Sequence, residues 1–137
     1  RHYLRDCSIH HSVNRFVNVH NTKYVDVERN VGWDALGAGF FLEDASETGQ
    51  PIGDQTQFVI LRDNLGMKIG RPGAPIDYPA GYPTVYKELE IIDPPVFWIQ
   101  HPNQIIEGNH AAGAAGHGFY LVPTWQINNT WSHQGAY

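Results

Sequence analysis

Short apolar runs, separated by polar and glycine-containing stretches, occupy most of the chain. Five of them have the length of a β-strand and are rich in β-branched or aromatic residues: YVDV, GFFLED, QFVIL, VFWI and GFYLV. Asn and Gly, which tolerate the left-handed backbone of a sharp corner, follow these runs. No segment keeps a 3.6-residue periodicity, so the pattern predicts an all-β fold.

The runs recur at related spacings, which indicates an internal repeat of about two dozen residues interrupted by insertions. An offset of 34 aligns FVILRDNLG with YVDVERNVG and places Asn64 on Asn30. An offset of 79 places Asn109 on Asn30 and Phe119 on Phe40. An offset of 24 gives three further alignments, namely Phe16 with Phe40, His10 with Asp34, and His20 with Asp44.

A coil of short parallel strands explains this repeat without crossover helices. It predicts about five rungs, with the three asparagines as a ladder at one corner and Phe16, Phe40 and Phe119 stacked inside. A last partial copy is expected at 127–135. The proline-rich segment 71–95 is expected to be an irregular loop inserted between rungs, because proline cannot donate to a strand ladder. We expect 1–137 to be a single β-helix segment, cut from a larger protein.

The composition narrows the range of partners. The net charge is −5, and all nine Lys and Arg lie within residues 1–87, without forming a basic run. Binding to nucleic acid or to a membrane surface through a cationic patch is therefore disfavoured. A membrane-spanning helix needs about 18 consecutive apolar residues, and no stretch of the sequence has that many. The single cysteine, Cys7, cannot form an internal disulfide, and Asn128 lies in an N-glycosylation sequon.

Four segments in this order resemble a known β-helix region: SIHHSVNRFVNVHNT, NVGWDALGAGFFLEDASE, DNLGMKI and FWIQHPNQIIEGNHAAGAAGHGFYL. The region occurs in a group that comprises the cell-surface hyaluronidases, the cell migration-inducing hyaluronidases and the fibrocystins. The resemblance implies a right-handed parallel β-helix in an extracellular or cell-surface setting. It also implies a link to hyaluronan or a related polysaccharide, and hyaluronidase-like glycosidase activity in some members.

Histidines and carboxylates that the 24-residue offset brings together form the main candidate site. His10 beside Asp34, and His20 beside Asp44, would suit general acid–base catalysis or a divalent cation, although no cofactor is certain. The same residues could instead form a structural ladder, in which a carboxylate accepts from an imidazole N–H. The candidate catalytic residues are His10, Asp34 and Asp44.

Ligand contacts are expected from residues near the same corners. A glycan could stack on exposed indoles or meet cationic side chains, although Trp98 within VFWI is expected in the core. The candidate ligand-binding residues are His11, His20, Arg15, Trp33 and Trp131.

Three hypotheses therefore remain open. The chain is an extracellular polysaccharide-binding β-helix module, a hyaluronidase-like enzyme, or a structural repeat that self-associates end to end through its strand edges into a fibril.

Overall fold

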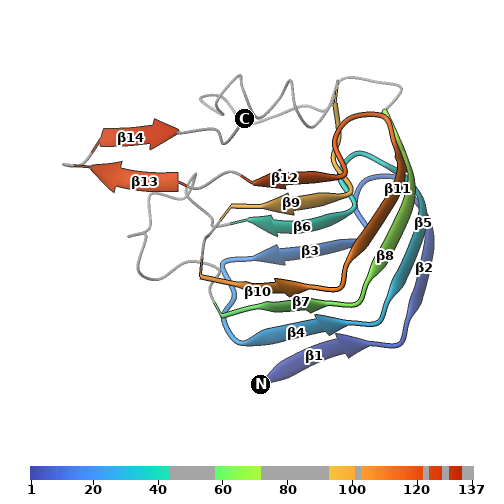
Figure 1. The fold of residues 1–137 in the computed structure, drawn as a ribbon, viewed down its shortest axis with the longest axis horizontal. Helices are drawn as coiled ribbons and strands as arrows, with labels where there is room; N and C mark the ends of the chain where they lie inside the picture. The colour runs from blue at the N-terminus through green and yellow to red at the C-terminus, as the bar shows by residue number, and fades with distance from the viewer. Residues whose placement is uncertain (44–57, 72–92, 101–102, 122–123, 128–129, 134–137) are drawn as a thin grey trace.

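The chain folds into a parallel β-helix, which Figure 1 shows as a computed structural model. The structure describes residues 1–43, 58–71, 93–100, 103–121, 124–127 and 130–133. This part of the chain contains strands and no helix, hence no helix able to span a membrane. Asp44, the region 72–92, Asn128 and the side chain of Trp131 lie outside it.

Three parallel sheets form the walls of the coil. The first sheet has the order β1-β4-β7-β10, from His2–Arg5, Val25–Glu28, Ile60–Arg62 and Ile105–Glu107. The second has the order β2-β5-β8-β11, from Ser8–Ser12, Val31–Leu36, Leu65–Gly70 and His110–Ala114. The third has the order β3-β6-β9-β12, from Val17–His20, Phe40–Glu43, Phe97–Ile99 and Phe119–Leu121. With four strands in each sheet, the described residues make four turns where the sequence predicted about five.

The predicted asparagine ladder is confirmed at the corner between the first and second sheets. Asn30 Nδ2 donates to Asn64 Oδ1 and Asn64 Nδ2 donates to Asn109 Oδ1, both at 2.9 Å. Each amide also donates to a carbonyl of the turn below, namely Leu4 O, Val27 O and Leu61 O respectively. Asn30 and Asn64 are fully buried, so these bonds satisfy polar groups that water cannot reach.

The register between the first two turns is 23 residues, not the predicted 24. Val17 pairs with Phe40, and His10 pairs with Trp33 rather than Asp34. His20 pairs with Glu43, so the expected partnership with Asp44 is wrong. Because successive strand residues face opposite sides, this slip by one residue changes the neighbours of every side chain in the turn.

Phe16 explains why the 24-residue alignment was misleading. Its ring lies 5.8 Å from that of Phe40, but it precedes β3 and packs over Gly32, where a Cβ would come within 2.3 Å of Phe16 Cδ2. The ring therefore fills the space left by the missing side chain of β5. The phenylalanine stack instead runs through Phe40, Phe97 and Phe119, with centroids 5.0 and 4.7 Å apart.

The last predicted copy, 127–135, does not form a parallel rung. β13 (Thr124–Ile127) and β14 (Thr130–His133) pair antiparallel with each other. Only two residues separate these strands in the sequence, and a connection of that length joins antiparallel neighbours, not parallel ones.

An ionic ladder covers the outer face of the first sheet. Arg5, Glu28, Arg62 and Glu107 occupy successive turns of one column, so charge alternates along the coil. Arg5 Nε lies 2.7 Å and Arg62 Nη1 3.1 Å from the two carboxylate oxygens of Glu28, and Arg62 also pairs with Glu107. The hydrogen bond to Glu107 raises the pKa of Arg62.

A second charged pair flanks this column. Arg29 donates through Nε and Nη2 to both carboxylate oxygens of Asp6, at 2.8 and 2.9 Å. This bidentate hydrogen bonding lowers the pKa of Asp6 and raises that of Arg29. Both side chains are exposed, so the pair contributes little to the free energy of unfolding. The lowered pKa of Asp6 nevertheless makes that contribution depend on pH.

Gly66 provides a first test of the core packing. A Cβ at this position would lie 2.2 Å from Val96 Cγ1, so Gly66→Ala should lower the free energy of unfolding by about 1–3 kcal/mol in urea titrations. Gly70→Ala is the matched control, because its new Cβ would meet the terminal Cδ2 of Leu36 at 3.2 Å, which can move. Equal effects of the two substitutions would contradict the proposed packing.

Asn64 provides a test of the ladder. Asn64→Ala removes the acceptor of Asn30 Nδ2 and the donor to Val27 O, and should cost about 3 kcal/mol or more in the same measurement. Asn18→Ala, at an exposed position of β3, should change stability by less than about 0.5 kcal/mol. A loss at Asn64 as small as that at Asn18 would show that the ladder contributes little.

The Asp6–Arg29 pair predicts a pH dependence of stability. Because the pKa of Asp6 is lowered in the folded state, its contribution is present above the usual Asp range near about 3.9 and is lost as pH falls through the lowered pKa. The difference in Tm between the wild type and Asp6→Asn should therefore shrink between pH 5 and pH 2. Asp63→Asn, whose carboxylate acts on Arg29 by charge alone, should show a smaller difference throughout.

Candidate functional site

The outer face of the second sheet carries the candidate site, because a backbone kink recurs there in every turn. His11, Asp34, Lys68 and Gly113 have φ between 54° and 66°, and strand pairing skips each of them. The preceding residues (His10, Trp33, Met67 and Ala112) also lie on the outer face. Each of the first three turns therefore presents two adjacent side chains to solvent where a regular strand would present one, and the fourth has only Ala112 because Gly113 has no side chain.

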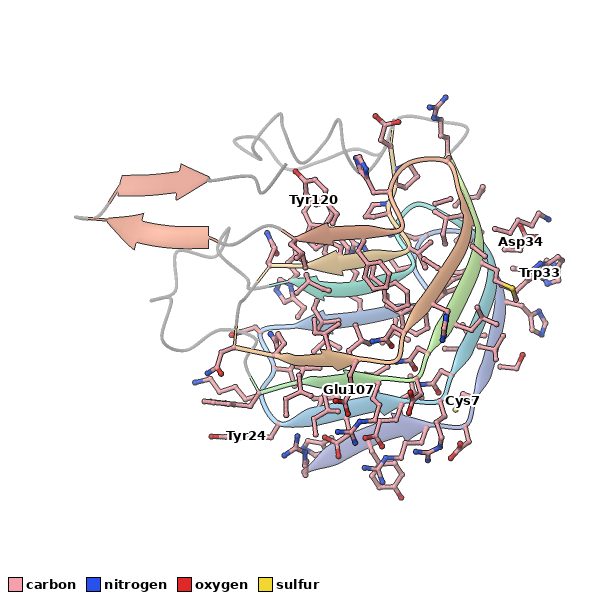
Figure 2. The ribbon with its side chains drawn as sticks, viewed as in Figure 1. Cys7, Tyr24, Trp33, Asp34, Glu107 and Tyr120 are labelled. Atoms are coloured by element: carbon pink, nitrogen blue, oxygen red, sulfur yellow. The ribbon has the colours of Figure 1, made fainter. Side chains whose placement is uncertain are left out.

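Five of these residues contact one another, and we call them the His–Trp–Lys face: His10, His11, Trp33, Asp34 and Lys68. Lys68 Nζ lies 3.1 Å from Asp34 Oδ1 and 4.5 Å from the centroid of the Trp33 ring. The His11 ring meets the Trp33 ring edge to face at 4.9 Å. Figure 2 shows Trp33 and Asp34 projecting together from the outside of the coil.

Two further polar contacts complete the His–Trp–Lys face. His10 Nδ1 and His11 Nδ1 are 2.7 Å apart, so one ring donates a hydrogen bond to the other. His11 Nε2 lies 3.7 Å from Asp34 Oδ2, within reach of an ion pair if the ring is protonated. The neighbour of Asp34 is therefore His11 and not the expected His10, which binds its own sequence neighbour instead.

The cationic and imidazole groups of this face are open to ligands, unlike Glu28 at the centre of the ionic ladder. The side chains of His11 and Lys68 are 61% and 58% exposed, whereas that of Glu28 in the ladder is 6% exposed. Trp33 is itself 39% exposed, which confirms the expectation of a surface indole. A ligand can therefore reach a cation, two imidazoles and an indole here without displacing packed protein.

Other candidate residues lie on a different wall of the coil. The guanidinium of Arg15 sits 3.7 Å above the Phe41 ring, on the outer side of the third sheet. His20 Nδ1 contacts Glu43 Oε2 at 2.9 Å, also on the third sheet. Trp98 is buried as expected, but it stacks on Phe41 in a separate cluster outside the main core. The sequence thus placed Arg15 and His20 in one site with His11 and Trp33, whereas the coil places these two pairs on different sheets.

Sequence reasoning missed Lys68, although a signal was present. The 34-residue offset that aligns Asn30 with Asn64 also aligns Asp34 with Lys68 and Trp33 with Met67. A cation one turn above a carboxylate is an opposite-charge pair across neighbouring strands. The expected cation site has no counterpart in the described part of the chain, where no three His, Cys, Asp or Glu side chains are grouped to hold a metal ion.

Comparisons with known proteins agree with this fold. The family model described as CEMIP beta-helix matches residues 1–133. The mouse protein named fibrocystin-L is 32% identical over 86% of the chain, and the zebrafish cell surface hyaluronidase is 35% identical over 88%. The human cell migration-inducing and hyaluronan-binding protein is 27% identical over 88%.

The chain corresponds to a small part of each relative, 2% of fibrocystin-L and 9% of the other two. No solved structure gave a significant match. The family model nevertheless covers almost all of the sequence, and the three parallel sheets are those of a β-helix. The chain belongs to the CEMIP beta-helix family.

Proposed function

We propose that the chain is a β-helix module of a larger extracellular or cell-surface protein, and that its His–Trp–Lys face binds an anionic polysaccharide of the hyaluronan type. The observation that carries this proposal is the exposed Trp33 indole with the Lys68 ammonium beside it. An indole and a cation on one surface match the two chemical features of a uronic-acid polymer, which has apolar C–H faces and carboxylates.

The aromatic contribution comes from Trp33. Its indole is fixed at the edge by the His11 ring and held at the base by β5, so little side-chain entropy is lost when a sugar packs on it. Burial of the exposed part of this large apolar side chain favours binding through the hydrophobic effect.

The charge contribution comes from Lys68. Its ion pair with Asp34 is exposed and therefore worth only about 0–1 kcal/mol, so a ligand carboxylate can replace Asp34 at small cost. The chain of 137 residues is acidic, with a net charge of −5. A local cation is consequently needed for a polyanion to approach.

Small residues on the fourth turn leave room for an extended ligand. Ala112 and Gly113 occupy the positions above Met67 and Lys68, and a Cβ added to Gly113 would meet only the Lys68 backbone, at 3.7 Å or more. A polymer that lies along the coil and contacts Lys68 can therefore continue over Ala112 and Gly113 without meeting a large side chain.

The names of two relatives, a cell surface hyaluronidase and a hyaluronan-binding protein, support hyaluronan as the first ligand to test and an extracellular or cell-surface location. Since this chain matches only 9% of each, their activities need not reside in the matched region.

The enzyme hypothesis has less support from the geometry, because His10 does not pair with Asp34. A role for Asp44, which lies outside the described residues, stays a prediction. Self-association end to end stays a prediction, as does glycosylation of Asn128.

Substitutions on the His–Trp–Lys face test the proposal. Trp33→Ala and Lys68→Asn should each weaken binding of hyaluronan oligosaccharides by about tenfold, equivalent to about 1.4 kcal/mol, in calorimetric titrations of the full chain. Asparagine is chosen at position 68 because it tolerates the positive φ of this residue. Neutral dextran should bind more weakly than hyaluronan.

Matched controls lie elsewhere on the surface. Tyr3→Ala removes an aromatic side chain that is 71% exposed on the first sheet, and Arg71→Asn removes an exposed cation paired with Asp93. Neither should change the Kd for hyaluronan by more than about twofold. If the controls weaken binding as much as Trp33→Ala and Lys68→Asn do, or if the wild type does not bind, this face is not the binding site.

A further inference from the structure

The His10–His11 pair sets a limit on the charge of the His–Trp–Lys face. The two Nδ1 atoms are 2.7 Å apart, and a hydrogen bond between imidazole nitrogens requires one of them to be unprotonated. The pair as observed therefore carries at most one positive charge. A second proton would convert both Nδ1 atoms into donors and force the rings apart.

Asp34 couples this pair to the cation that we assign to ligand binding. Its carboxylate lies between Lys68 Nζ at 3.1 Å and His11 Nε2 at 3.7 Å. With both histidines neutral, the charges of Lys68 and Asp34 sum to zero. With both protonated, the same four side chains sum to +2, and His11 competes with Lys68 for Asp34.

The ionisable groups that face this pair come from three strands. β2 supplies His10 and His11, β5 supplies Asp34, and β8 supplies Lys68. On the fourth turn, β11 supplies the uncharged Ala112 and Gly113 next to them, and His110 lies at the start of that strand. Histidine is the side chain that ordinarily changes charge between pH 5 and pH 8. Protonation of His10 and His11 therefore raises the summed charge of these four side chains from zero toward +2, which favours binding of a polyanion.

We propose that the His–Trp–Lys face is a proton-dependent binding site for carboxylate-bearing polysaccharides, in which protonation of His10 and His11 releases Lys68 from Asp34 and strengthens binding. This inference rests on the function proposed above and adds its regulation. A neutral polysaccharide lacks the carboxylates that the added charge attracts, so its binding does not respond to pH.

Affinity measurements at two pH values test this inference. The Kd of the full chain for hyaluronan oligosaccharides should be about three- to tenfold lower at pH 5.5 than at pH 7.5 at constant ionic strength, since each exposed charge pair contributes modestly. The double variant His10→Gln/His11→Asn should bring the ratio of the two Kd values close to one. Glutamine and asparagine keep the polarity, and asparagine tolerates the φ of 54° at position 11.

Two further variants make the outcome decisive. His2→Gln/His117→Gln removes two exposed histidines elsewhere and should keep the wild-type ratio. Asp34→Asn removes the internal counter-ion of Lys68, so binding at pH 7.5 should tighten. All variants must first show the same cooperative thermal unfolding as the wild type.

The possible results separate the two proposals. Binding that tightens at pH 5.5 only when His10 and His11 are present supports the proton-dependent site. Binding with the same Kd at both pH values, or an unchanged ratio in His10→Gln/His11→Asn, overturns this inference and leaves the proposed function standing. Absence of hyaluronan binding at both pH values overturns both.

Discussion

The amide ladder of Asn30, Asn64 and Asn109 is the interaction on which the geometry of the coil depends. Each of the three asparagine oxygens accepts from a backbone N–H of the turn below, and the three donors are the N–H groups of Cys7, Asn30 and Asn64. Each side-chain nitrogen donates to a carbonyl of that same turn. These bonds fix both the axial spacing and the register at one corner. Because the corner is buried, a shift by one residue would leave several amide groups without partners.

Once the register is fixed at this corner, the side chains that stack in columns before and after the ladder determine whether each outer face is charged, polar or apolar. On the first sheet, the column that precedes the ladder alternates arginine and glutamate, and neighbouring turns neutralise each other. Glu28 is buried beneath Arg5 and Arg62, and its ion pairs with them join neighbouring turns of the coil. On the second sheet the columns that follow the ladder differ from turn to turn, and their polar groups remain exposed.

The kink at His11, Asp34, Lys68 and Gly113 separates structural from ligand-accessible positions on that second sheet. Non-glycine residues with positive φ are uncommon and cost about 1–2 kcal/mol each, so three of them in one column mark a conformation that the surrounding packing imposes. The residues on either side, such as Ile9 and Ala35, return to the core. The kink therefore adds an outward side chain to each of the first three turns without loss of core packing.

The sequence by itself determined the coil, the asparagine ladder and the exposure of Trp33, because each depends on residue types that have few alternatives: corner asparagines at a constant offset, apolar runs of strand length, and an indole beside a corner. Tertiary structure alone decided which side chains meet. Phe16 fills the space over Gly32 from outside its strand, so matching the two phenylalanines by sequence gave an offset of 24 where hydrogen bonding requires 23. That single residue moves Asp34 from His10 to His11, and Lys68 of the next turn then lies beside Asp34 and Trp33. The register is set by how volumes fill the interior of the coil, and volumes contributed by distant residues cannot be read from a local pattern.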